Sequence, residues 1–404
     1  MVQLEDAQKF LLKGCRLAST MRLSLDKCLG RVLAEDIICD MDFPPFDRSP
    51  LDGYAVRKAD VQAALRDNPI TLTQIEFVPA GNWPKRPISP GEATRVMTGA
   101  KIPDGADAVV RLEDTSCDGR RVSILSSGKA EKNICRRGEE FKAGDMILQK
   151  GTGLQEGSLG ILAMLGVEKP RVYAKPKVGI LATGSELLPI SATLKPGMIR
   201  DTNSYMLAAK VQNIGGNALL MGQVKDDVDA MVEKLESFPR LSVYITTGGA
   251  SVGDYDLAGR LFERLGVTTL FSGVAIKPGM PAMAGRWGDS LIVSLSGNPA
   301  ACSVSFEVLV RPLLKRMAGF CLYEHRKIIV KLAGRFDKAS PTRRLVWANC
   351  FAVNGSLFAT PLVYQGNGML RSIAEANALL DIPANSPPLD RGTEATALLL
   401  GSFL

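Results

Sequence analysis

Strand-like and helical segments alternate between residues 177 and 317, and no other feature of the sequence constrains the fold as strongly. Five short apolar runs (KVGILAT, ALLMG, VYITT, SGVAI and LIVSL) are separated by helical patterns over 204–214, 227–238, 256–265 and 300–317. Strands joined by helices pair in parallel, because a helical crossover returns the chain to the same end of the sheet. We therefore predict a doubly wound, mostly parallel α/β domain over 175–318.

A loop of glycines and polar residues follows the third run. Residues 241–256 read LSVYITTGGASVGDYD, and the part after Thr247 supplies glycines, a hydroxyl and two carboxylates: Gly248, Gly249, Gly253, Ser251, Asp254 and Asp256. Glycines let the backbone turn tightly and approach a ligand. Ligands of open α/β sheets bind beyond the carboxyl ends of the strands, so this loop is a candidate anion or metal site. A plain turn with Asp256 as a helix N-cap is the alternative.

Two other strands of this domain also end in polar loops. The first is followed by Thr183, Gly184, Ser185 and Glu186, and the last by Ser296, Gly297, Asn298 and Pro299. Because the carboxyl ends of parallel strands meet at one edge, we expect these loops to converge with the Gly248 loop. Residues 201–204 (DTNS) add a carboxylate and a helix N-cap, and 277–281 (KPGMP) present Lys277 rigidly.

A proline-rich segment, residues 42–56, forms a second candidate site. It reads DFPPFDRSPLDGYAV, with three prolines and three aspartates around one glycine. Prolines fix the backbone, so the polar groups of Asp47, Ser49, Asp52 and Tyr54 stand on a rigid loop that would hold a ligand well. A purely structural proline corner with an Asp-Gly turn is the alternative.

Short alternating runs between residues 70 and 148 predict a small β domain over 46–149. It contains RVMTGAKIPDGADAVV with Thr98 and Gly99, and the segment RRGEE, whose paired arginines could face phosphate and whose acids could face a metal: Arg136, Arg137, Glu139 and Glu140. Helical patterns over 3–38 and 156–167 flank it. We therefore predict that the β domain is inserted into a helical domain formed by 1–45 and 150–174.

The last part of the chain, residues 325–404, returns to strand-like runs with one short helix near 370–376. This pattern predicts a C-terminal domain resembling a small β barrel. Its functional candidates are Arg343 and Arg344 before a strand, and the turn 366–368 before the helix. Exposed arginines and an ordinary turn are the alternatives.

Composition limits the classes of function. The chain of 404 residues is 46% hydrophobic and carries a net charge of +7 without a basic run, which argues against a nucleic-acid partner. No apolar run approaches membrane-spanning length, and the N-terminus does not resemble a signal peptide, so we expect no membrane association and a cytoplasmic location. The eight cysteines form no C-x-x-C pair, and the single histidine, His325, excludes multi-histidine metal sites.

Five separated segments, in order along nearly the whole chain, resemble the molybdopterin molybdenumtransferase family, known as MoeA and as the E domain of gephyrin. They are DFPPFDRSPLDGYAV, RVMTGAKIPDGADAVV, GILATGSEL, TTGGASVGDYD with KPGMP and SGNPAA, and GNGMLRSIAEAN. The resemblance implies an elongated homodimer of four-domain subunits. It also implies a magnesium-dependent activity that inserts molybdate into adenylylated molybdopterin with loss of AMP. Molybdopterin adenylyltransferase and apo-molybdoenzymes are the expected partners.

The resemblance also implies site residues. The catalytic candidates are Asp52, Thr98, Glu140, Glu186, Asp201 and Asp254, of which Asp201, Asp254 and Glu186 would hold Mg²⁺. With the polar loops described above, the candidates for binding pterin and oxyanion are Thr183, Gly184, Ser185, Gly248, Gly249, Ser251, Lys277, Pro278, Gly297, Asn298, Pro299, Arg343 and Arg344. Molybdate and phosphate are tetrahedral dianions that backbone N–H groups, a hydroxyl and an ammonium can hold. Carboxylates would repel a bare dianion, which is why we expect them to act through Mg²⁺.

Three departures from the family pattern favour an alternative function. Family members often carry a second lysine where this chain has Met280, proline (in Leu-Pro-Gly-Asn-Pro) where it has Ser296, and serine where it has Asn367. Loss of a cation and a hydroxyl near an oxyanion would weaken its binding, by about 1.5–3 kcal/mol for a charged hydrogen bond. The alternative is therefore a catalytically weak paralogue that binds pterin or acts as a scaffold.

A serine hydrolase is the remaining hypothesis. Residues 249–253 fit G-x-S-x-G after a predicted strand, and Asp289 and His325 follow Ser251 in hydrolase order. Two acids directly after the motif would oppose an oxyanion, and the chain does not pass straight into a helix as a nucleophile elbow requires.

Overall fold

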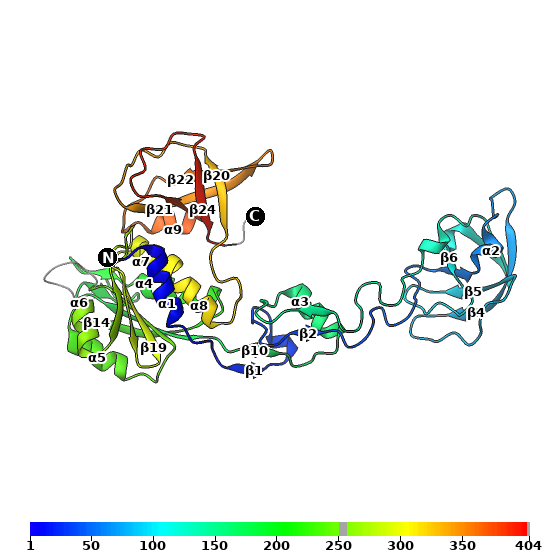
Figure 1. Ribbon diagram of the computed structural model, residues 1–404, viewed down its shortest axis with the longest axis horizontal. Coiled ribbons are helices and arrows are strands. Elements are labelled where there is room, and N and C mark those ends of the chain that lie inside the picture. The colour runs from blue at the N-terminus through cyan, green and yellow to red at the C-terminus, as the bar shows by residue number, and fades with distance from the viewer. Residues whose placement is uncertain (250–256, 402–404) are drawn as a thin grey trace. The chain divides into compact units, whose positions relative to one another are not determined.

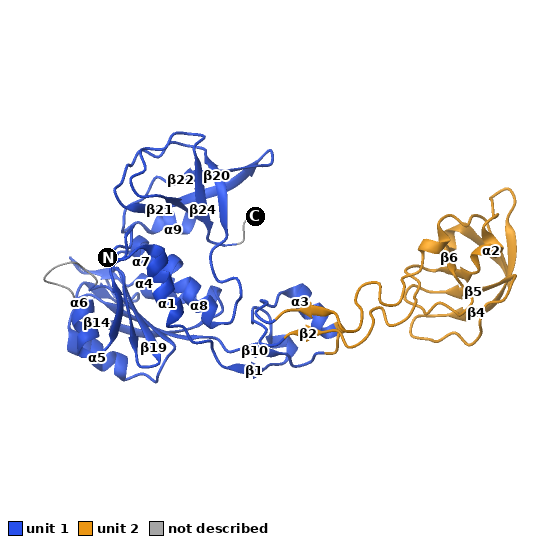
Figure 2. Ribbon diagram, viewed as in Figure 1, with its two compact units in different colours: residues 1–35, 150–163, 167–404 blue, residues 36–149, 164–166 orange. Residues whose placement is uncertain are grey.

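The structure is a computed structural model that describes residues 1–249 and 257–401. The chain divides into two compact units (Figure 2). Unit 1 comprises residues 1–35, 150–163 and 167–404, and unit 2 comprises residues 36–149 and 164–166. Each unit has hydrophobic cores of its own. Unit 2 takes in the predicted insert 46–149 together with the residues that lead into it.

A six-stranded sheet forms the centre of unit 1. Its spatial order is β14 (Asn217–Val224), β11 (Lys177–Thr183), β15 (Val243–Thr247), β19 (Ser290–Leu295), β18 (Met283–Trp287) and β16 (Thr268–Ser272). The first four strands are parallel, β18 runs antiparallel to β19, and β16 runs antiparallel to β18. The prediction of a mostly parallel α/β domain is confirmed. The sequence pattern did not predict β18, which pairs with β19 through the tight turn at Gly288 and Asp289.

Helices cover both faces of this sheet (Figure 1). On one face lie α1 (Leu4–Lys13), α4 (Asn203–Asn213), α7 (Pro299–Ser305) and α8 (Arg311–Met317), with a π-helical turn, Phe306–Val310, between the last two. They share a core with Ile180, Ile245 and Val293. On the other face α5 (Val228–Glu236) and α6 (Leu257–Arg264) pack on Leu181, Tyr244 and Ile292. Apolar residues line both faces of each central strand, which is why these strands read as continuous apolar runs.

The helical prediction for residues 3–38 is wrong beyond Lys13. The helix α1 ends at Gly14, and the chain then forms β1 (Thr20–Arg22), a 3₁₀ turn (Leu25–Lys27) and β2 (Ile37–Ile38). Strand β1 pairs with β10 (Arg171–Tyr173) in antiparallel fashion. This partner lies far along the sequence, so local periodicity does not reveal it. The helix predicted near 156–167 is present as α3 (Glu156–Met164).

The C-terminal region of unit 1 is a closed barrel of five strands. These are β20 (Lys327–Leu332), β21 (Arg343–Val353), β22 (Ser356–Pro361), β23 (Ala378–Ile382) and β24 (Glu394–Leu399), and the pairing of β21 with β23 closes the circle. The barrel prediction is confirmed. The short strand β17 (Ile276–Lys277) extends the barrel sheet beside β21, and α9 (Leu370–Glu375) is the predicted short helix.

Unit 2 is the small β domain that the sequence predicts. Its six-stranded sheet has the order β6 (Ala108–Arg111), β3 (Gly53–Val56), β5 (Glu92–Val96), β4 (Ile70–Val78), β8 (Arg121–Ile124) and β7 (Thr115–Asp118). A short helix, α2 (Lys58–Val61), and two 3₁₀ turns, Leu112–Asp114 and Ala130–Lys132, connect the strands. A separate pair of strands joins β2 to β9 (Met146–Leu148).

No helix in the described part of the chain is long and apolar enough to cross a membrane.

Candidate functional site at the carboxyl edge of the α/β sheet

Three loops lie against one another at the carboxyl ends of β11, β15 and β19. Gly248 has φ +96°, and a Cβ atom there would lie 2.1 Å from the carbonyl oxygen of Thr183. A Cβ atom on Gly297 would lie 3.4 Å from the Cα atom of Gly248. Gly248 is therefore required for the close approach to Thr183, whereas Gly297 lies in ordinary van der Waals range of Gly248. The convergence of the three loops expected from strand order is present.

The amides of these loops bond mostly to the protein itself. The Gly248 N–H donates to the Leu295 carbonyl at 3.2 Å, and the Gly184 N–H to the Val224 carbonyl at 3.2 Å. The Asn298 N–H donates to the Ser296 hydroxyl oxygen at 3.2 Å. The Gly248 N–H already has an acceptor in this conformation, and the binding of an oxyanion at Gly248 stays a prediction. Side-chain cations must supply more of any anion binding at this edge.

The loop after β11 has an acidic partner that sequence reasoning missed. The Ser185 N–H donates to Asp226 Oδ2 at 3.1 Å, and the Asp226 N–H donates to the Ser185 hydroxyl oxygen at 3.4 Å. Asp226 follows the end of β14, so the rule that identified the other loops could have found it. Glu186 is exposed, and its carboxylate packs close to Gly184.

Asp201 is the buried acid of the site. It precedes α4, is 5% exposed, and its Oδ1 accepts the Ser204 N–H at 3.0 Å, which supports the start of the helix. Asn203 on the same helix donates from Nδ2 to the Gly297 carbonyl at 2.8 Å. A short pair of strands, β12 (Leu187–Leu188) and β13 (Ile199–Arg200), leads from the Glu186 loop to Asp201. Asp201 and the loop 296–299 therefore form one connected group.

The helix α7 brings further elements to this group. The loop 296–299 leads directly into α7, whose Ala300 N–H lies in the first turn and donates to the Asn367 carbonyl at 2.8 Å. The turn 277–281 packs on α7, because a Cβ on Gly279 would lie 2.4 Å from the Ser305 hydroxyl oxygen. Lys277 is exposed and pairs in register with Arg344 of β21. Two cations therefore lie on neighbouring strands beside α7.

The two neighbouring arginines have different environments. Arg343 binds Asp381 through Nε at 2.6 Å and Nη2 at 2.5 Å, and binds Glu5 through Nη1 at 2.5 Å. The hydrogen bonds that Arg343 donates to Asp381 raise the pKa of Arg343 further above its usual range. Arg344 has a buried Nε with no hydrogen-bond partner among the residues described. Arg344 is therefore the arginine of the two that has no carboxylate partner among the described residues, and Arg343 joins α1 to the barrel.

Unit 2 contains two candidate site residues, Asp52 and Thr98, that are hydrogen-bonded to each other. Asp52 Oδ1 accepts the Thr98 N–H at 2.7 Å and the Thr98 hydroxyl at 2.9 Å. These hydrogen bonds, the backbone bond first, lower the pKa of Asp52, so its carboxylate stays charged. Glu140 is exposed, and its N–H donates to the Phe43 carbonyl at 3.1 Å.

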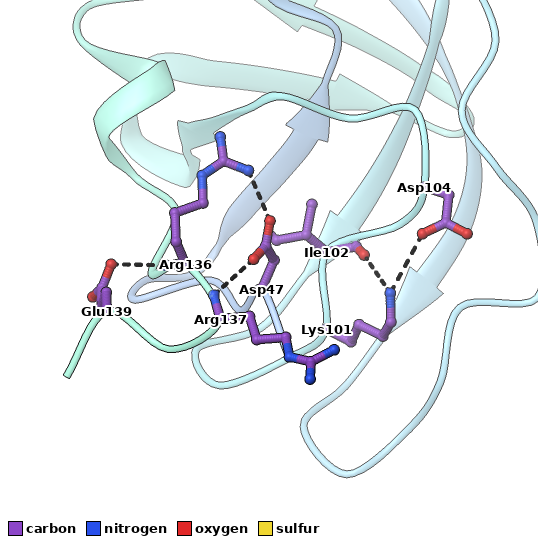
Figure 3. Close-up of polar contacts among 7 residues, drawn as sticks. All are labelled: Asp47, Lys101, Ile102, Asp104, Arg136, Arg137 and Glu139. Carbon is purple, nitrogen blue, oxygen red and sulfur yellow. Dashed lines mark hydrogen bonds and ion pairs between the residues drawn. The ribbon is translucent and has the colours of Figure 1, made fainter. Parts of the chain in front are cut away.

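The arginines of the RRGEE segment are bound by the proline-rich loop (Figure 3). Asp47 accepts from Arg136 Nη1 at 2.7 Å and from the Arg137 N–H at 2.8 Å. Arg137 Nε donates to Asp42 Oδ2 at 2.8 Å. Burial opposes the charge on Asp47, but the bonds from Arg137 and Arg136 lower its pKa overall. Each guanidinium group already binds one aspartate through a single nitrogen, and the suggestion that these arginines face phosphate stays a prediction.

The metal prediction can be compared with the donors that are present. No group of three or more His, Cys, Asp or Glu side chains in residues 1–249 and 257–401 is placed to hold a metal ion. Ser251, Gly253, Asp254 and Asp256 lie outside the described residues. The carboxylates of Asp201 and Glu186 are hard oxygen donors, and Mg²⁺ is often held by one or two carboxylates together with substrate phosphates. The donor chemistry therefore fits Mg²⁺ when substrate phosphates supply the remaining ligands.

Comparison with family models shows to which protein family the chain belongs. Residues 2–166 match the MoeA N-terminal region (domains I and II), 179–316 match a probable molybdopterin binding domain, and 330–400 match the MoeA C-terminal region (domain IV). The chain belongs to the MoeA family. The matched ranges follow one another along nearly the whole chain, as the sequence resemblance implied.

Individual MoeA relatives agree with this assignment. A protein named molybdopterin molybdenumtransferase from Bacillus subtilis (strain 168) is 37% identical over 386 residues, which are 94% of this chain and 89% of that protein. One of the same name from Staphylococcus epidermidis is 34% identical and covers 99% of this chain and 96% of that protein. The crystal structure of a molybdopterin biosynthesis MoeA protein from Pyrococcus horikoshii OT3 has a TM-score of 0.83 at 34% identity and covers 99% of this chain and 100% of that one.

The hydrolase hypothesis fails in this MoeA fold. Asp289 lies at the amino end of β19, opposite the carboxyl edge, and binds Arg16 at 2.7 Å. His325 is buried, with Nδ1 2.8 Å from the Leu399 carbonyl and Nε2 3.0 Å from the Glu307 carbonyl. Neither residue is placed to act with a nucleophile in the Gly248 loop.

Proposed function

We propose that the protein inserts molybdate into adenylylated molybdopterin and releases AMP in a magnesium-dependent step. The observation that carries this proposal is the group around α7: glycine-rich loops packed together, a buried Asp201, and the neighbouring cations Lys277 and Arg344. Membership of the MoeA family, with relatives named molybdopterin molybdenumtransferase, supports the substrate class.

The residues of the chain have separable tasks in this reaction. Lys277 and Arg344 attract a tetrahedral dianion, and the partly buried Arg344 holds its charge in a position of reduced solvent screening. The loops at Thr183, Gly248 and Gly297 form the floor beneath the ligand. Asp201 supplies a fixed negative charge that its bond from the Ser204 N–H helps to orient. The proposed reaction uses no covalent nucleophile of the chain, and AMP is the group that leaves.

Mg²⁺ would be held by Asp201 and Glu186, with Asp254 and the phosphates of the substrate completing its ligands. When bound, it would neutralise phosphate charge and polarise the bond between the adenylate and the pterin phosphate. Asp52, Thr98 and Glu140 of unit 2 are proposed to act in the same reaction, with the hydrogen bonds from Thr98 keeping Asp52 charged.

A homodimer is part of the proposal. In unit 1 the side chains of Leu17, Met21 and Leu29 are 46%, 45% and 58% exposed, although all three are large and apolar. A second copy that covered them would remove this surface from water. Molybdopterin adenylyltransferase as the supplier of substrate, apo-molybdoenzymes as recipients of the product, and a cytoplasmic location are proposed on the same basis.

A turnover assay tests the function. The full chain is mixed with adenylylated molybdopterin, Mg²⁺ and molybdate, and both AMP release and reconstitution of an apo-molybdoenzyme are followed. Asp201→Asn should lower AMP release at least about tenfold, because it removes the buried charge of the site. Asp229→Asn is the matched control, since Asp229 is 81% exposed on α5 and binds only Arg264 among the ion pairs of the described residues.

The same assay distinguishes the transferase from the scaffold alternative. AMP release that requires molybdate, or tungstate in its place, supports the transferase. Tight pterin binding without AMP release in the presence of either oxyanion would overturn the proposal and favour a binding protein.

A further inference from the structure

Asn203 at the start of α4 makes a contact that its own helix does not need. Its side chain is 7% exposed, and Nδ2 donates to the carbonyl of Gly297, which lies 94 positions further along the chain. A carbonyl oxygen can only accept a hydrogen bond, so the nitrogen of the amide must face Gly297 and the direction of Oδ1 is fixed. Oδ1 is buried and has no hydrogen-bond partner in the described part of the chain.

Helix capping does not explain this arrangement. Asparagine near the start of a helix usually accepts a bond from a backbone N–H of that helix. Here Thr202 occupies the N-cap position, and Asp201 Oδ1 accepts the Ser204 N–H at 3.0 Å. The amide of Asn203 is therefore committed to another loop, and its oxygen is a buried acceptor that the described residues leave unsatisfied. Such an acceptor costs free energy until a donor binds it.

The contact lies where it can position the whole site. Gly297 packs on Gly248, which packs on Thr183, so the bond from Asn203 secures the end of this row of loops. Two turns further along α4, Lys210 Nζ lies 2.5 Å from Glu307 Oε1 in the π-helical turn after α7. The helix that begins beside Asp201 is thus attached to the α7 segment at two points. The Asn203 contact is the one nearer the site.

We propose that Asn203 is a positioning residue. Its amide nitrogen holds loop 296–299 in place relative to Asp201 and Gly248, and its amide oxygen accepts a hydrogen bond from the bound ligand. The loop contact is independent of the reaction, whereas its catalytic consequence rests on the proposed function.

Hydrogen exchange of the ligand-free protein tests the loop contact. Asn203→Asp removes the donor and places a carboxylate against the Gly297 carbonyl, and Asn203→Ala removes the side chain. Both should raise amide exchange in a peptide covering 296–304 at least about tenfold at neutral pH. Asn213→Asp, the same change at the exposed end of α4, should leave this peptide at the wild-type rate.

A change of pH separates positioning from general damage to the helix. A protonated carboxyl has the shape of an amide and can donate, so N203D should recover wild-type protection of 296–304 at about pH 5, whereas N203A should not. Wild-type rates are measured at each pH for reference. Unchanged exchange in both variants at neutral pH would overturn the proposed loop contact, whatever the outcome of the turnover assay.

Ligand binding and turnover test the rest of the proposal. N203A should raise the Kd for molybdopterin at least about tenfold, which corresponds to about 1.4 kcal/mol, because it removes the acceptor. If N203A loses affinity for molybdopterin without Mg²⁺, the donor is a group on the pterin. If it loses affinity only with Mg²⁺, the donor is a metal-bound water. N203D should lower kcat more than it changes the KM for molybdate, with recovery toward pH 5. A wild-type Kd for molybdopterin in N203A would overturn the proposal that Asn203 Oδ1 accepts a hydrogen bond from the ligand.

If the wild-type protein releases no AMP, the proposed function fails. The exchange experiment then still decides whether Asn203 holds the loop, so the two failures are distinguishable.

Discussion

At the scale of single residues, burial and partners separate side chains that look equivalent in the sequence. Arg343 and Arg344 are adjacent, yet one is bound by two carboxylates and the other has an unpaired buried Nε. Neighbours on a strand point to opposite faces, so adjacent residues of one type meet different surroundings. Chemical type alone therefore does not assign a role.

Substitution of the two arginines should have opposite consequences. Arg343→Gln leaves Asp381, 11% exposed, without its cation and should lower the free energy of unfolding by about 2 kcal/mol or more. Arg344→Gln should raise the KM for molybdate about tenfold or more, with a small change in Tm. Calorimetry and AMP-release kinetics on both variants check this. Equal loss of Tm in the two variants would contradict the assignment.

Lys315 on α8 should make stability depend on pH. Burial, followed by repulsion from Arg311 and Arg326, lowers the pKa of Lys315 to about 8 from its usual value of 10.5. Below about pH 8 the folded protein keeps the Lys315 ammonium charged in a partly buried position. The free-energy cost of burying this charge therefore lowers stability in full at these pH values. Between about pH 8 and 10.5 the unfolded chain binds the proton and the folded protein does not, so stability from this group rises with pH.

The corresponding variant is Lys315→Met. It should be more stable than wild type at pH 7, by on the order of 1 kcal/mol after allowance for the exposed half of the side chain. This advantage should shrink as pH rises from about 8 toward 10.5. Lys315 lies 4.6 Å from the Phe320 ring centroid, so Lys234→Met, which removes a similar contact with Phe238, controls for the lost cation–π interaction. A constant difference across this pH range would contradict the prediction.

At the scale of elements, backbone contacts between loops build the site. The loops after β11, β15 and β19 touch through Thr183, Gly248 and Gly297, and a larger residue at Gly248 would collide with a backbone carbonyl. Backbone atoms cannot move aside as a flexible side chain can. The conformation of one loop therefore fixes the positions of its neighbours.

Gly248→Ala tests this dependence. It adds both an unfavourable positive φ and a Cβ at 2.1 Å from the Thr183 carbonyl oxygen. Gly222→Ala on β14 is the matched control, because Gly222 has φ +88° but open space around its Cβ position. Both should lower Tm through backbone strain of about 1–3 kcal/mol, but only Gly248→Ala should also reduce AMP release at least about tenfold. Normal turnover in Gly248→Ala would show that the loops tolerate separation.

At the scale of the whole molecule, two units with separate cores carry the candidate residues. Unit 1 contains Asp201, Lys277 and Arg344, and unit 2 contains Asp52 and Thr98. The buried side chains of unit 2, such as Ile124, belong to core clusters that contain only unit 2 residues. A domain with its own core can unfold without the rest of the chain.

Calorimetry should therefore show two transitions. Ile124→Ala in unit 2 and Leu207→Ala in unit 1 each remove a fully buried side chain and should cost about 2–5 kcal/mol in the unit that contains it. Each variant should lower one transition and leave the other within error of wild type. A single transition that both variants lower equally would show that the units unfold as one.

Local patterns predicted the elements that depend on local burial. The apolar runs at 178–183 and 243–247 form central strands because both of their faces are covered, and the carboxyl-edge loops follow from parallel strand order. The helix expected over 14–38 failed because β1 pairs with β10, a contact set by distant residues. The use of the Gly248 amide and the binding of Arg136 and Arg137 by aspartates were missed for the same reason.

The sequence by itself therefore determined the α/β rhythm, the β character of 46–149 and 325–404, and the family, because these depend on periodicity and on motifs that are contiguous in the chain. Only the tertiary structure decided which polar groups are free. Arg343 is bound by Glu5 and Asp381, and Asn203 bonds to Gly297, partners that lie far along the chain. A hydrogen bond forms between groups that folding brings together, so whether a side chain is available to a ligand depends on three-dimensional contacts.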